Sequence, residues 1–354
     1  EAYVRVECAA PEFDESCTPS VGFCEEGTRF VPVKLVDVAG LIPGAHEGKG
    51  LGNQFLTDLN EADVLVHVVD FSGETDLEGE PTEGHDPRDD IDFLENELDM
   101  WYLDILEKGL ERYRSGYHGE EKNVEEDLAE QMSAFKTNKD EIKQVLLATD
   151  AGLDPDEWDE ATKERVAREI RKRTKPIVIA ANKMDKPAAQ EHFDDVTADP
   201  DYDHLTFVPT SAHAEKALKQ AEEAGVVDYQ PGASSFEIVG DPSEEQAAGL
   251  EQIREYVEAF GGTGVQDVLE SALFDVMGAI AIFPGSANGR ADSQGVFRDC
   301  FILPEDSTTE DFAYHLHSDI GDGLLHGIDC RSNRQVGSDH ELEHRDVVEI
   351  VTTN

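Results

Sequence analysis

The chain has 354 residues, 39% of them hydrophobic, which is enough apolar material for a sizeable core and two or three domains. Its 79 acidic residues outnumber its 29 basic residues and give a formal net charge of -50. No apolar stretch approaches membrane-spanning length, and nothing at the start resembles a secretory signal. We therefore expect a soluble, cytoplasmic protein with no membrane partner.

The negative charge is spread along the whole chain and is not gathered in one tail. Apolar periodic segments continue throughout, which argues against a disordered acidic protein. We interpret the charge as halophilic, an adaptation to very high salt, where a Debye length of about 3 Å at about 1 M suppresses self-repulsion. Local patches of the protein surface would then have to bind a nucleic-acid or ribosome partner, because the net charge of the whole chain is strongly negative.

Five apolar segments predict strands. The last three are continuous apolar runs, the pattern of strands that are buried on both faces of a parallel sheet. Helical periodicity separates most of them, so we expect an α/β fold with a mostly parallel sheet. The segments are residues 3–7, 30–37, 62–70, 175–181 and 205–210.

About a hundred residues separate the run 62–70 from the run 175–181, far more than an ordinary crossover connection needs. Apolar residues keep helical spacing through this interval, which predicts an inserted helical arm. For Trp101, Tyr102 and Trp158 we favour packing between the arm's own helices, with contact to a partner as the alternative.

Five cysteines suit a reducing cytoplasm better than a disulfide framework in a chain of this length. Three of them fall within seventeen residues, with eight and then six residues between them and no nearby His. Zinc normally takes four ligands, often from closely spaced cysteine pairs, so we favour free thiols in a loop and keep a bound metal as the alternative. The five are Cys8, Cys17, Cys24, Cys300 and Cys330.

The apolar run Val31–Val36 leads to Asp37, which begins the pattern Asp-x-x-Gly that ends at Gly40. If this run is a buried parallel strand, Asp37 lies at its carboxyl end, where ligands bind in such sheets. A carboxylate there could hold Mg²⁺ through water, and the backbone N–H of Gly40 could sense a γ-phosphate. The pattern alone is weak, because a strand followed by a glycine turn is common.

The tetrapeptide "NKMD", Asn182–Asp185, directly follows the predicted strand 175–181. The Asp185 carboxylate can accept hydrogen bonds from both N1–H and the 2-amino group of guanine, whereas adenine offers neither donor in that arrangement. Asn182 can bond the base edge, and Lys183 can lay its aliphatic stem over the ring system. The alternative for the tetrapeptide is a simple turn or helix cap.

Small residues follow the next predicted strand, 205–210. The backbone of Ser211 and Ala212 could approach the same base. Three fragments of this kind, in order and each at the end of a strand, favour a guanine-nucleotide site over three unrelated turns.

The stretch "DVAGLIPGAHEGKGLGNQFL" resembles the switch II region of the Obg-like GTPases, specifically the YchF subfamily. "NKMD" and "TSA" match that family's G4 and G5 motifs, the latter followed by His213, which we add to the base site. The segment from "FRDCFILPEDSTTEDF" to "DVVEIV" resembles a TGS domain, a small β-grasp module. The resemblance covers essentially the whole chain. It implies a P-loop-NTPase-type sheet and binding of GTP and Mg²⁺.

On this basis we expect four segments. The GTPase domain is divided by the helical arm, and its C-terminal portion includes additional helices. Within the TGS-like segment, Ser307 and Glu310 predict a capping box before a helix that Gly321 ends. The segments are 1–84 (GTPase domain before the arm), 85–172 (arm), 173–282 (GTPase domain after the arm, with C-terminal helices) and 283–354 (TGS-like domain).

The sequence contains no G-x-x-x-x-G-K-[ST] motif, the P-loop that supplies most of the phosphate grip. The stretch "GAHEGKG", Gly44–Gly50, does not fit this motif. Three residues, and not four, lie between its first two glycines, and Gly50 stands where the motif has Ser or Thr. We therefore expect that the first strand, the P-loop and the switch I Thr are missing from this chain. The chain as given would bind nucleotide weakly, and the full-length protein would be a GTPase.

The resemblance also implies a switch mechanism. Gly40 would move when the γ-phosphate is lost, and the following glycines would permit the rearrangement. Leu41 stands where Ras-like enzymes place a water-orienting Gln, so hydrolysis should be slow or use another group. His46 is a candidate for that group, and a solvated loop histidine is its alternative. Retention of Asp185 favours GTP over ATP.

Two function classes remain open from the sequence. The first is a monomeric GTP-hydrolysing switch that acts on ribosomes, RNA or translation. The second is a nucleotide-independent adaptor whose arm and TGS-like domain bind partners. The TGS-like segment is acidic and shows no basic patch that would support RNA binding.

Overall fold

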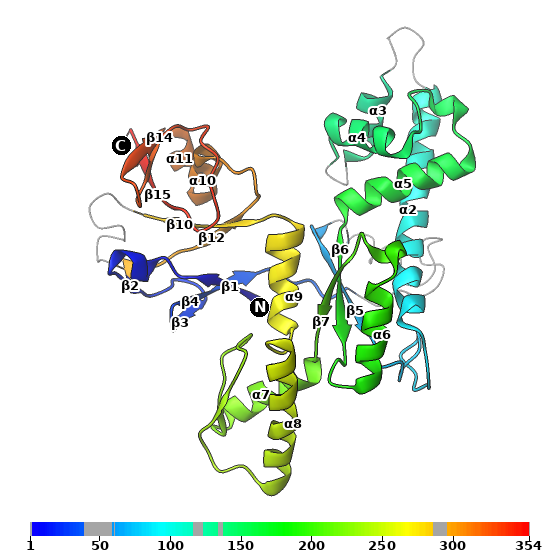
Figure 1. The fold of residues 1–354 in the computed structure, drawn as a ribbon. Helices are drawn as coiled ribbons and strands as arrows, with labels where there is room; N and C mark the ends of the chain where they lie inside the picture. Colours follow the sequence, from blue (N-terminus) through cyan, green and yellow to red (C-terminus); the bar gives the residue numbers. More distant parts are fainter. Residues whose placement is uncertain are drawn as a thin grey trace. The chain divides into compact units, whose positions relative to one another are not determined.

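The computed structural model describes residues 2–38, 59, 61–115, 123–133, 137–285 and 296–353. By their internal contacts these residues form two compact units (Figure 1). One unit combines Glu1–Leu35 with Leu269–Asn354, and the other is Val36–Val268. This division differs from the four segments expected from the sequence, because the first 35 residues join the C-terminal region of the chain.

The second unit contains a three-stranded parallel sheet, which confirms the predicted α/β class and the three later strands. Its middle strand is buried along nearly its whole length, as expected for a parallel strand whose two faces are both covered. The expectation of full burial is wrong for the first strand, where Val68 is 62% exposed. Among the described strands this one has a neighbour on one side only. The order is β5 (Leu65–Asp70), β6 (Ile177–Asn182), β7 (Thr206–Pro209).

The predicted helical arm is present between β5 and β6 (Figure 1). The long helix α2 contacts β5 and α6 near one end and the other arm helices near the other. A single hydrophobic cluster runs from the sheet into the arm, so the arm is continuous with the core of this unit. The helices are α2 (Pro87–Ser115), α3 (Val124–Gln131), α4 (Lys139–Thr149) and α5 (Glu160–Thr174).

The arm's aromatic residues pack inside it, as predicted. Trp101, Tyr102 and Trp158 are all buried, and the rings of Trp101 and Tyr102 meet edge to face. The Tyr102 hydroxyl lies 2.8 Å from Oγ1 of Thr174, which ties α2 to α5. Beside it, the buried guanidinium of Arg171 is paired with carboxylates of α2.

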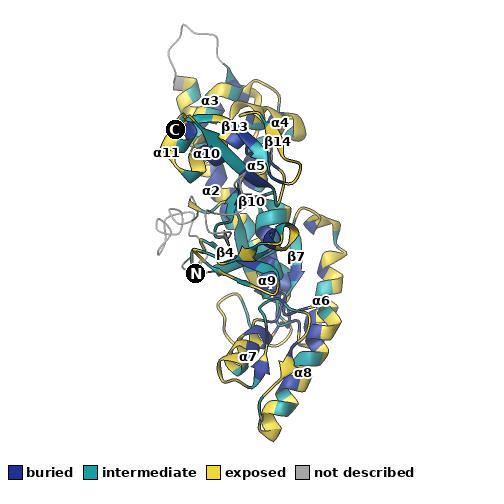
Figure 2. Ribbon diagram, turned by 90° about the vertical axis from the view of Figure 1, so that its left-hand side faces the viewer, coloured by how far each residue is buried: buried dark blue, intermediate teal, exposed yellow. Residues whose placement is uncertain are grey.

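Three helices flank the carboxyl ends of β6 and β7. Helix α8 begins with a capping box between Ser243 and Gln246 and ends at Gly261 in the left-handed conformation. Buried and exposed residues alternate along α6 and α8, as expected for helices with one face on the core (Figure 2). The helices are α6 (Pro187–Thr197), α7 (Ala212–Glu223) and α8 (Glu244–Phe260), and a short hairpin of β8 (Val227–Asp228) and β9 (Glu237–Ile238) follows α7.

The first unit contains an antiparallel sheet from the start of the chain, in the order β1-β4-β3. The prediction of one strand over 30–37 that leads to Asp37 in a parallel sheet is wrong. The strand begins earlier, at Thr28, and ends at Val33, which pairs with Ala2 of the antiparallel strand β1. The strands are β1 (Ala2–Glu7), β3 (Phe23–Glu25) and β4 (Thr28–Val33).

A five-stranded sheet and two helices make up the rest of this unit, consistent with a β-grasp module. Val4 and Val31 share a core with Phe283 and Val347, so the two sheets pack together. The helix α9 (Val265–Glu270) and a π-helical turn, Ser271–Val276, precede it. The sheet is β12 (Phe301–Leu303), β10 (Ile280–Pro284), β15 (Val347–Thr352), β13 (Leu324–Asp329), β14 (Arg334–Val336), with α10 (Thr309–Leu316) and α11 (Ser318–Asp322).

The predicted capping box of α10 is displaced by one residue. Thr308 and Asp311 form it: the Thr308 hydroxyl accepts from the Asp311 N–H at 3.2 Å, and the Asp311 carboxylate accepts from the Thr308 N–H at 2.9 Å. Ser307 is instead buried, and its carbonyl accepts from the N–H of Leu342. The helix ends at Leu316, and a second helix contains Gly321.

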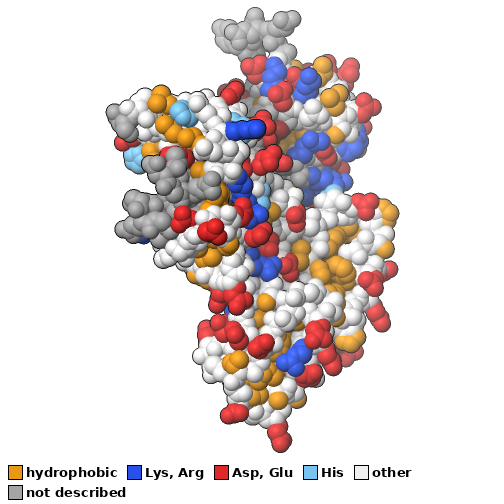
Figure 3. Space-filling view, turned by 60° about the vertical axis from the view of Figure 1, so that its left-hand side comes forward, with side chains coloured by type: hydrophobic (Ala, Val, Ile, Leu, Met, Phe, Trp, Pro, Cys, Tyr) orange, Lys and Arg blue, Asp and Glu red, His pale blue; other side chains and the backbone are white. Residues whose placement is uncertain are grey.

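No helix in the described ranges is long and apolar enough to cross a membrane. Acidic side chains are scattered over the face drawn in Figure 3, as the even charge distribution of the sequence predicts.

Candidate functional site

The ends of β6 and β7 are bonded to each other where the motif "NKMD" leaves the sheet. The N–H of Thr210 donates to the carbonyl of Ala181 at 2.8 Å, and the N–H of Met184 donates to the carbonyl of Thr210 at 3.1 Å. Lys183 takes a left-handed conformation with φ of 65°, which turns the chain sharply after the strand. Met184 is buried, whereas Asp185 is exposed. The motif is therefore anchored by backbone bonds and displays its acid to solvent.

Side chains from the two predicted base-binding fragments meet at this edge. The Ser211 hydroxyl donates to Oδ1 of Asp185 at 2.7 Å and also accepts from the N–H of Ala214, so it caps helix α7. The Oδ1 atom of Asn182 accepts from the N–H of Ala212 at 3.1 Å. The two fragments therefore lie together at this edge, and their role in binding a base stays a prediction.

The loop between α8 and α9 fixes Ser211 from behind. The Ser211 N–H donates to the carbonyl of Thr263 at 2.8 Å. Gly264 follows with φ of 79°, and a Cβ there would lie 1.9 Å from the carbonyl oxygen of Pro209. Only glycine permits this close approach to the end of β7.

A cavity of about 1090 Å³ opens at this edge, within the second unit. It is large enough for a nucleoside. Helices α7 and α8 supply small and apolar side chains and some polar ones to its walls, and the segments that follow the strands supply further polar groups. The predicted residues that line it are Asn182, Lys183, Asp185, Ser211 and His213.

Asp70, which the sequence patterns did not single out, positions Lys183. It ends β5, and its Oδ2 accepts from Nζ of Lys183 at 2.8 Å and from the Thr75 hydroxyl at 2.6 Å. Its Oδ1 accepts from the N–H and the hydroxyl of Ser72. Burial acts to raise the pKa of Asp70, but the hydrogen bonds from Lys183, Ser72 and Thr75 outweigh it and lower the pKa to about 2. The signal available in the sequence was an acid at the end of a predicted buried strand.

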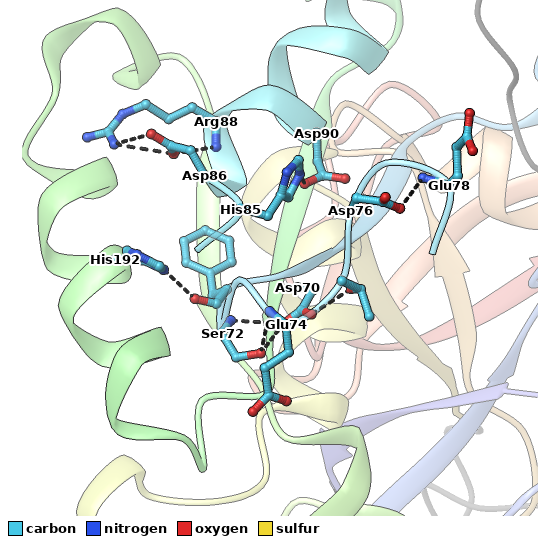
Figure 4. A network of polar contacts seen from close by, with 12 residues as sticks. Asp70, Ser72, Glu74, Asp76, Glu78, His85, Asp86, Arg88, Asp90 and His192 are labelled. Carbon is cyan, nitrogen blue, oxygen red and sulfur yellow. Dashed lines mark hydrogen bonds and ion pairs between the residues drawn. The ribbon is translucent and has the colours of Figure 1, made fainter. Parts of the chain in front are cut away.

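The turn that follows Asp70 is fastened to the neighbouring helices (Figure 4). His192 of α6 lies 2.7 Å from the carbonyl of Phe71, and His85 lies 2.6 Å from Asp90 of α2. Arg88 bridges α2 to Asp195 of α6 at 2.8 Å. These contacts hold the turn, and hence the Asp70 carboxylate, in place.

Tyr256 of α8 is a second residue that the sequence patterns did not reveal. Its ring stacks on Phe260 and lines the cavity, and the residue is 6% exposed. Burial, together with the negative charge of Asp185, raises the pKa of its hydroxyl. That hydroxyl has no hydrogen-bond partner within the described regions of the chain. A buried O–H without a partner among the described residues, in a cavity that Asp185 also lines, is an arrangement that a polar ligand would satisfy.

The predicted magnesium ligand is not built into this edge. Asp37 is exposed and lies four residues beyond the end of β4, and its neighbour Val38 packs on the core of the second unit. Within the described ranges no other metal-ligating side chains group around Asp37. The predicted switch and catalytic residues Gly40, Leu41 and His46 lie outside the described residues.

Three protein-family models match the chain. Residues 19–102 match "50S ribosome-binding GTPase", residues 180–286 match "Obg-like GTPase YGR210-like, G4 motif-containing domain", and residues 290–352 match "TGS domain". The second match includes the motif at Asn182–Asp185, and the third confirms the TGS assignment. The match over residues 19–102 does not support the expectation that the P-loop segment is missing.

Relatives cover nearly the whole chain. An uncharacterized GTP-binding protein of Methanocaldococcus jannaschii is 38% identical over 355 aligned positions, which cover 99% of this chain and 88% of that protein. An uncharacterized GTP-binding protein of Schizosaccharomyces pombe is 34% identical over 86% of this chain and 78% of its own length. The crystal structure of a GTP-binding protein from Pyrococcus horikoshii OT3 superposes with a TM-score of 0.77 at 33% identity, over 99% of this chain and 92% of that one.

These names do not specify the YchF subfamily, which stays a prediction. The agreement between the base-site geometry, the family models and the near full-length relatives establishes the broader assignment. The chain belongs to the Obg-like GTPase family of GTP-binding proteins.

Proposed function

We propose that the full-length protein binds GTP with the guanine base at the polar end of the cavity and hydrolyses it slowly as a molecular switch. The observation that carries the proposal is the placement of Asp185. Its Oδ1 accepts from Ser211, and the carboxylate keeps further lone pairs for the N1–H and 2-amino donors of guanine. The comparisons give no support to the nucleotide-independent adaptor.

The neighbouring residues take distinct roles in this proposal. The Oδ1 of Asn182 is occupied by Ala212, which leaves its amide NH₂ to donate to the base edge. Ala212 therefore acts by orienting Asn182. Lys183 is held by Asp70, so its aliphatic stem has a fixed direction beside the cavity. His213 is exposed to solvent and lines the cavity, so it could contact a bound nucleotide.

Base selection is tested by Asp185→Asn. The variant exchanges an acceptor for a donor opposite N1–H, so affinity for GTP should fall by about 100-fold, as expected for two lost hydrogen bonds to a charged group, while affinity for XTP rises. Titration with fluorescent GTP and competition by XTP and ATP measure both. Asp194→Asn, on the exposed side of α6, is the matched control and should bind GTP like the unmodified chain. An unchanged GTP-to-XTP ratio in Asp185→Asn would remove the basis for guanine recognition.

The contribution of the phosphate groups to nucleotide affinity is a separate part of the proposal. Because the sequence contains no G-x-x-x-x-G-K-[ST] motif, we infer that the chain as given gains little from the triphosphate. Competition by guanosine, GDP and GTP, with and without Mg²⁺, measures that gain. Equal affinities support the inference, and a GTP affinity far above that of guanosine contradicts it.

We keep Asp37 as the proposed magnesium ligand and Leu41 as the reason for slow hydrolysis.

We further propose a cytoplasmic, monomeric, salt-adapted protein whose partner is the ribosome. The support is the TGS domain and the match to a family described as ribosome-binding. Co-sedimentation of the full-length protein with 50S subunits in concentrated KCl tests it: binding should be stronger with a non-hydrolysable GTP analogue than with GDP. Equal binding with both nucleotides, or none, would refute a nucleotide-controlled ribosome switch.

A further inference from the structure

Three thiols that are separated in the sequence converge in the first unit. The sulfur atoms of Cys8, Cys17 and Cys24 all lie within 4.8 Å of one another. Cys8 directly follows β1, and its N–H donates to the carbonyl of Gly27. A short 3-10 helix, Ala10–Phe13, returns the chain to β2 (Ser16–Cys17), and β3 then presents Cys24. The cysteine spacing favoured free thiols in a loop. In the structure, these three thiols form a compact cluster.

A fourth thiol comes from the other end of the chain. The strand β11 (Val296–Phe297) pairs in parallel with β2, and the N–H of Ser20 donates to the carbonyl of Arg298 at 2.9 Å. This pairing brings Cys300 to the hydrophobic core that contains Cys8, and the two thiols interact electrostatically. The set of four sulfurs therefore joins two segments from opposite ends of the chain.

A buried positive charge lies beside the four sulfurs. Arg29 is 1% exposed, and it interacts electrostatically with Cys8, Cys17, Cys24 and Cys300. Its Nη1 donates to the carbonyl of Arg298, but its Nε and Nη2 have no hydrogen-bond partner, and no carboxylate pairs with it, among the residues that the structure describes. A guanidinium stays charged, and a buried charge without a counter-ion is strongly destabilising. Negative charge on the sulfur atoms would therefore stabilise the guanidinium of Arg29.

We propose that Cys8, Cys17, Cys24 and Cys300 bind a structural zinc ion. Zinc–sulfur bonds of about 2.3 Å in a tetrahedron place the sulfurs about 3.8 Å apart, which agrees with the clustering of the first three. Four thiols release four protons to solvent on binding Zn²⁺, and the centre they form carries two negative charges. Arg29 then gains both a counter-charge and sulfur acceptors. A disulfide would draw together only two sulfurs and would leave Arg29 without an anion.

The site would fasten the N-terminal antiparallel sheet to the segment that enters the TGS domain. Its chemistry is separate from the nucleotide cavity, which lies in the other unit. Loss of zinc should therefore loosen the first unit without altering which base is recognised.

The metal content of the full chain, purified without chelators, tests the proposal. Elemental analysis should find about one zinc ion per chain, and replacement by Co²⁺ should give the intense near-ultraviolet thiolate-to-metal band and the visible bands of a tetrahedral four-thiolate site. Five titratable thiols with no bound metal would overturn the proposal. So would a disulfide among the four, or iron in place of zinc.

Variants locate the ligands. Cys24→Ser and Cys300→Ser should each lower zinc affinity by at least 10-fold and shift the Co²⁺ bands toward three thiolates. Cys330→Ser is the matched control: Cys330 is buried in the same core but is not one of the four, and this variant should retain its zinc. Unchanged zinc affinity in Cys300→Ser would overturn the assignment of the fourth ligand. The metal content and Co²⁺ spectrum of the unmodified chain decide the main proposal even where a variant does not fold.

Discussion

The hydroxyl of Ser211 donates a 2.7 Å hydrogen bond to Oδ1 of Asp185, and so joins side chains that follow two neighbouring parallel strands. The same hydroxyl accepts from the N–H of Ala214 at the start of α7. One side chain thus couples the orientation of Asp185, the proposed base-binding acid, to a helix terminus. This explains in physical terms why a small hydroxyl residue suits the position after β7, where backbone approach alone had been expected.

Ser211→Ala should weaken both functions of that hydroxyl. Loss of the cap should lower the free energy of unfolding by about 1 kcal/mol, and the released Asp185 side chain should bind guanine nucleotides several-fold more weakly. Chemical denaturation and fluorescent-GTP titration measure the two effects. Asn138→Ala removes the cap of α4 in the arm and serves as the control, with a similar loss of stability and no loss of affinity. If Ser211→Ala and Asn138→Ala had the same affinity for GTP, this result would argue against a positioning role for Ser211.

Tyr256→Phe should separate ligand binding from stability. The hydroxyl has no partner within the described structure, so its removal should leave the free energy of unfolding unchanged or slightly higher. If the hydroxyl bonds the base or the ribose, affinity for GTP should fall by about 10-fold, the equivalent of one hydrogen bond. Phe260→Leu removes the stacked neighbour and retains the hydroxyl, and it serves as a comparison. Full GTP affinity in Tyr256→Phe would place the ligand elsewhere in the cavity.

Asp70→Asn should act on the nucleotide site through Lys183. The variant removes the charge that holds Nζ at 2.8 Å, so the lysine stem should lose its fixed direction and GTP affinity should fall several-fold. Lys183→Met keeps an apolar stem without the charge, and it should retain more affinity than Lys183→Ala. This ranking distinguishes stacking of the stem from a charge effect. Equal affinities of the two lysine variants would show that the stem contributes nothing.

Much of the base site could be predicted because its signals are local. The apolar run 175–181 predicts a strand, and the four residues after it carry the chemistry, so the convergence of Asn182 and Asp185 with Ser211 followed from parallel topology alone. The same logic failed at Asp37, because residues 30–33 pair with antiparallel neighbours and residues 34–37 lie outside the strand. Apolar content does not distinguish the two kinds of pairing in a short strand.

Other features depend on contacts that the sequence does not display. Tyr256 looks like one more apolar position of a helix, and only the tertiary structure shows that it lines the same cavity as Asp185. The cysteine spacings gave no familiar zinc pattern, because Cys300 enters through strand pairing between distant segments. Long-range convergence of this kind leaves no periodic signal in the chain.

The arm should lose stability in acid through Glu95. Its carboxylate accepts from the buried Arg171 at 2.6 Å and lies 2.7 Å from His204. Burial acts to raise the pKa of Glu95, but the contacts with His204 and Arg171 outweigh it and lower the pKa to about 2. Since the folded-state pKa is below the unfolded value of about 4.3, the stabilisation is complete above that value and is lost as the pH falls toward 2.

Denaturation at constant KCl between pH 3 and pH 7 measures this effect. Glu95→Gln should be less stable at pH 7, because it leaves Arg171 short of one counter-charge, and its stability should fall less steeply below pH 4.5 because the titrating group is gone. Glu111→Gln, an exposed change on the same helix, should follow the unmodified chain at every pH. An equally steep acid loss in Glu95→Gln would assign the acid sensitivity to other carboxylates, Asp70 foremost, since the hydrogen bonds from Lys183, Ser72 and Thr75 outweigh its burial and lower its pKa to about 2 as well.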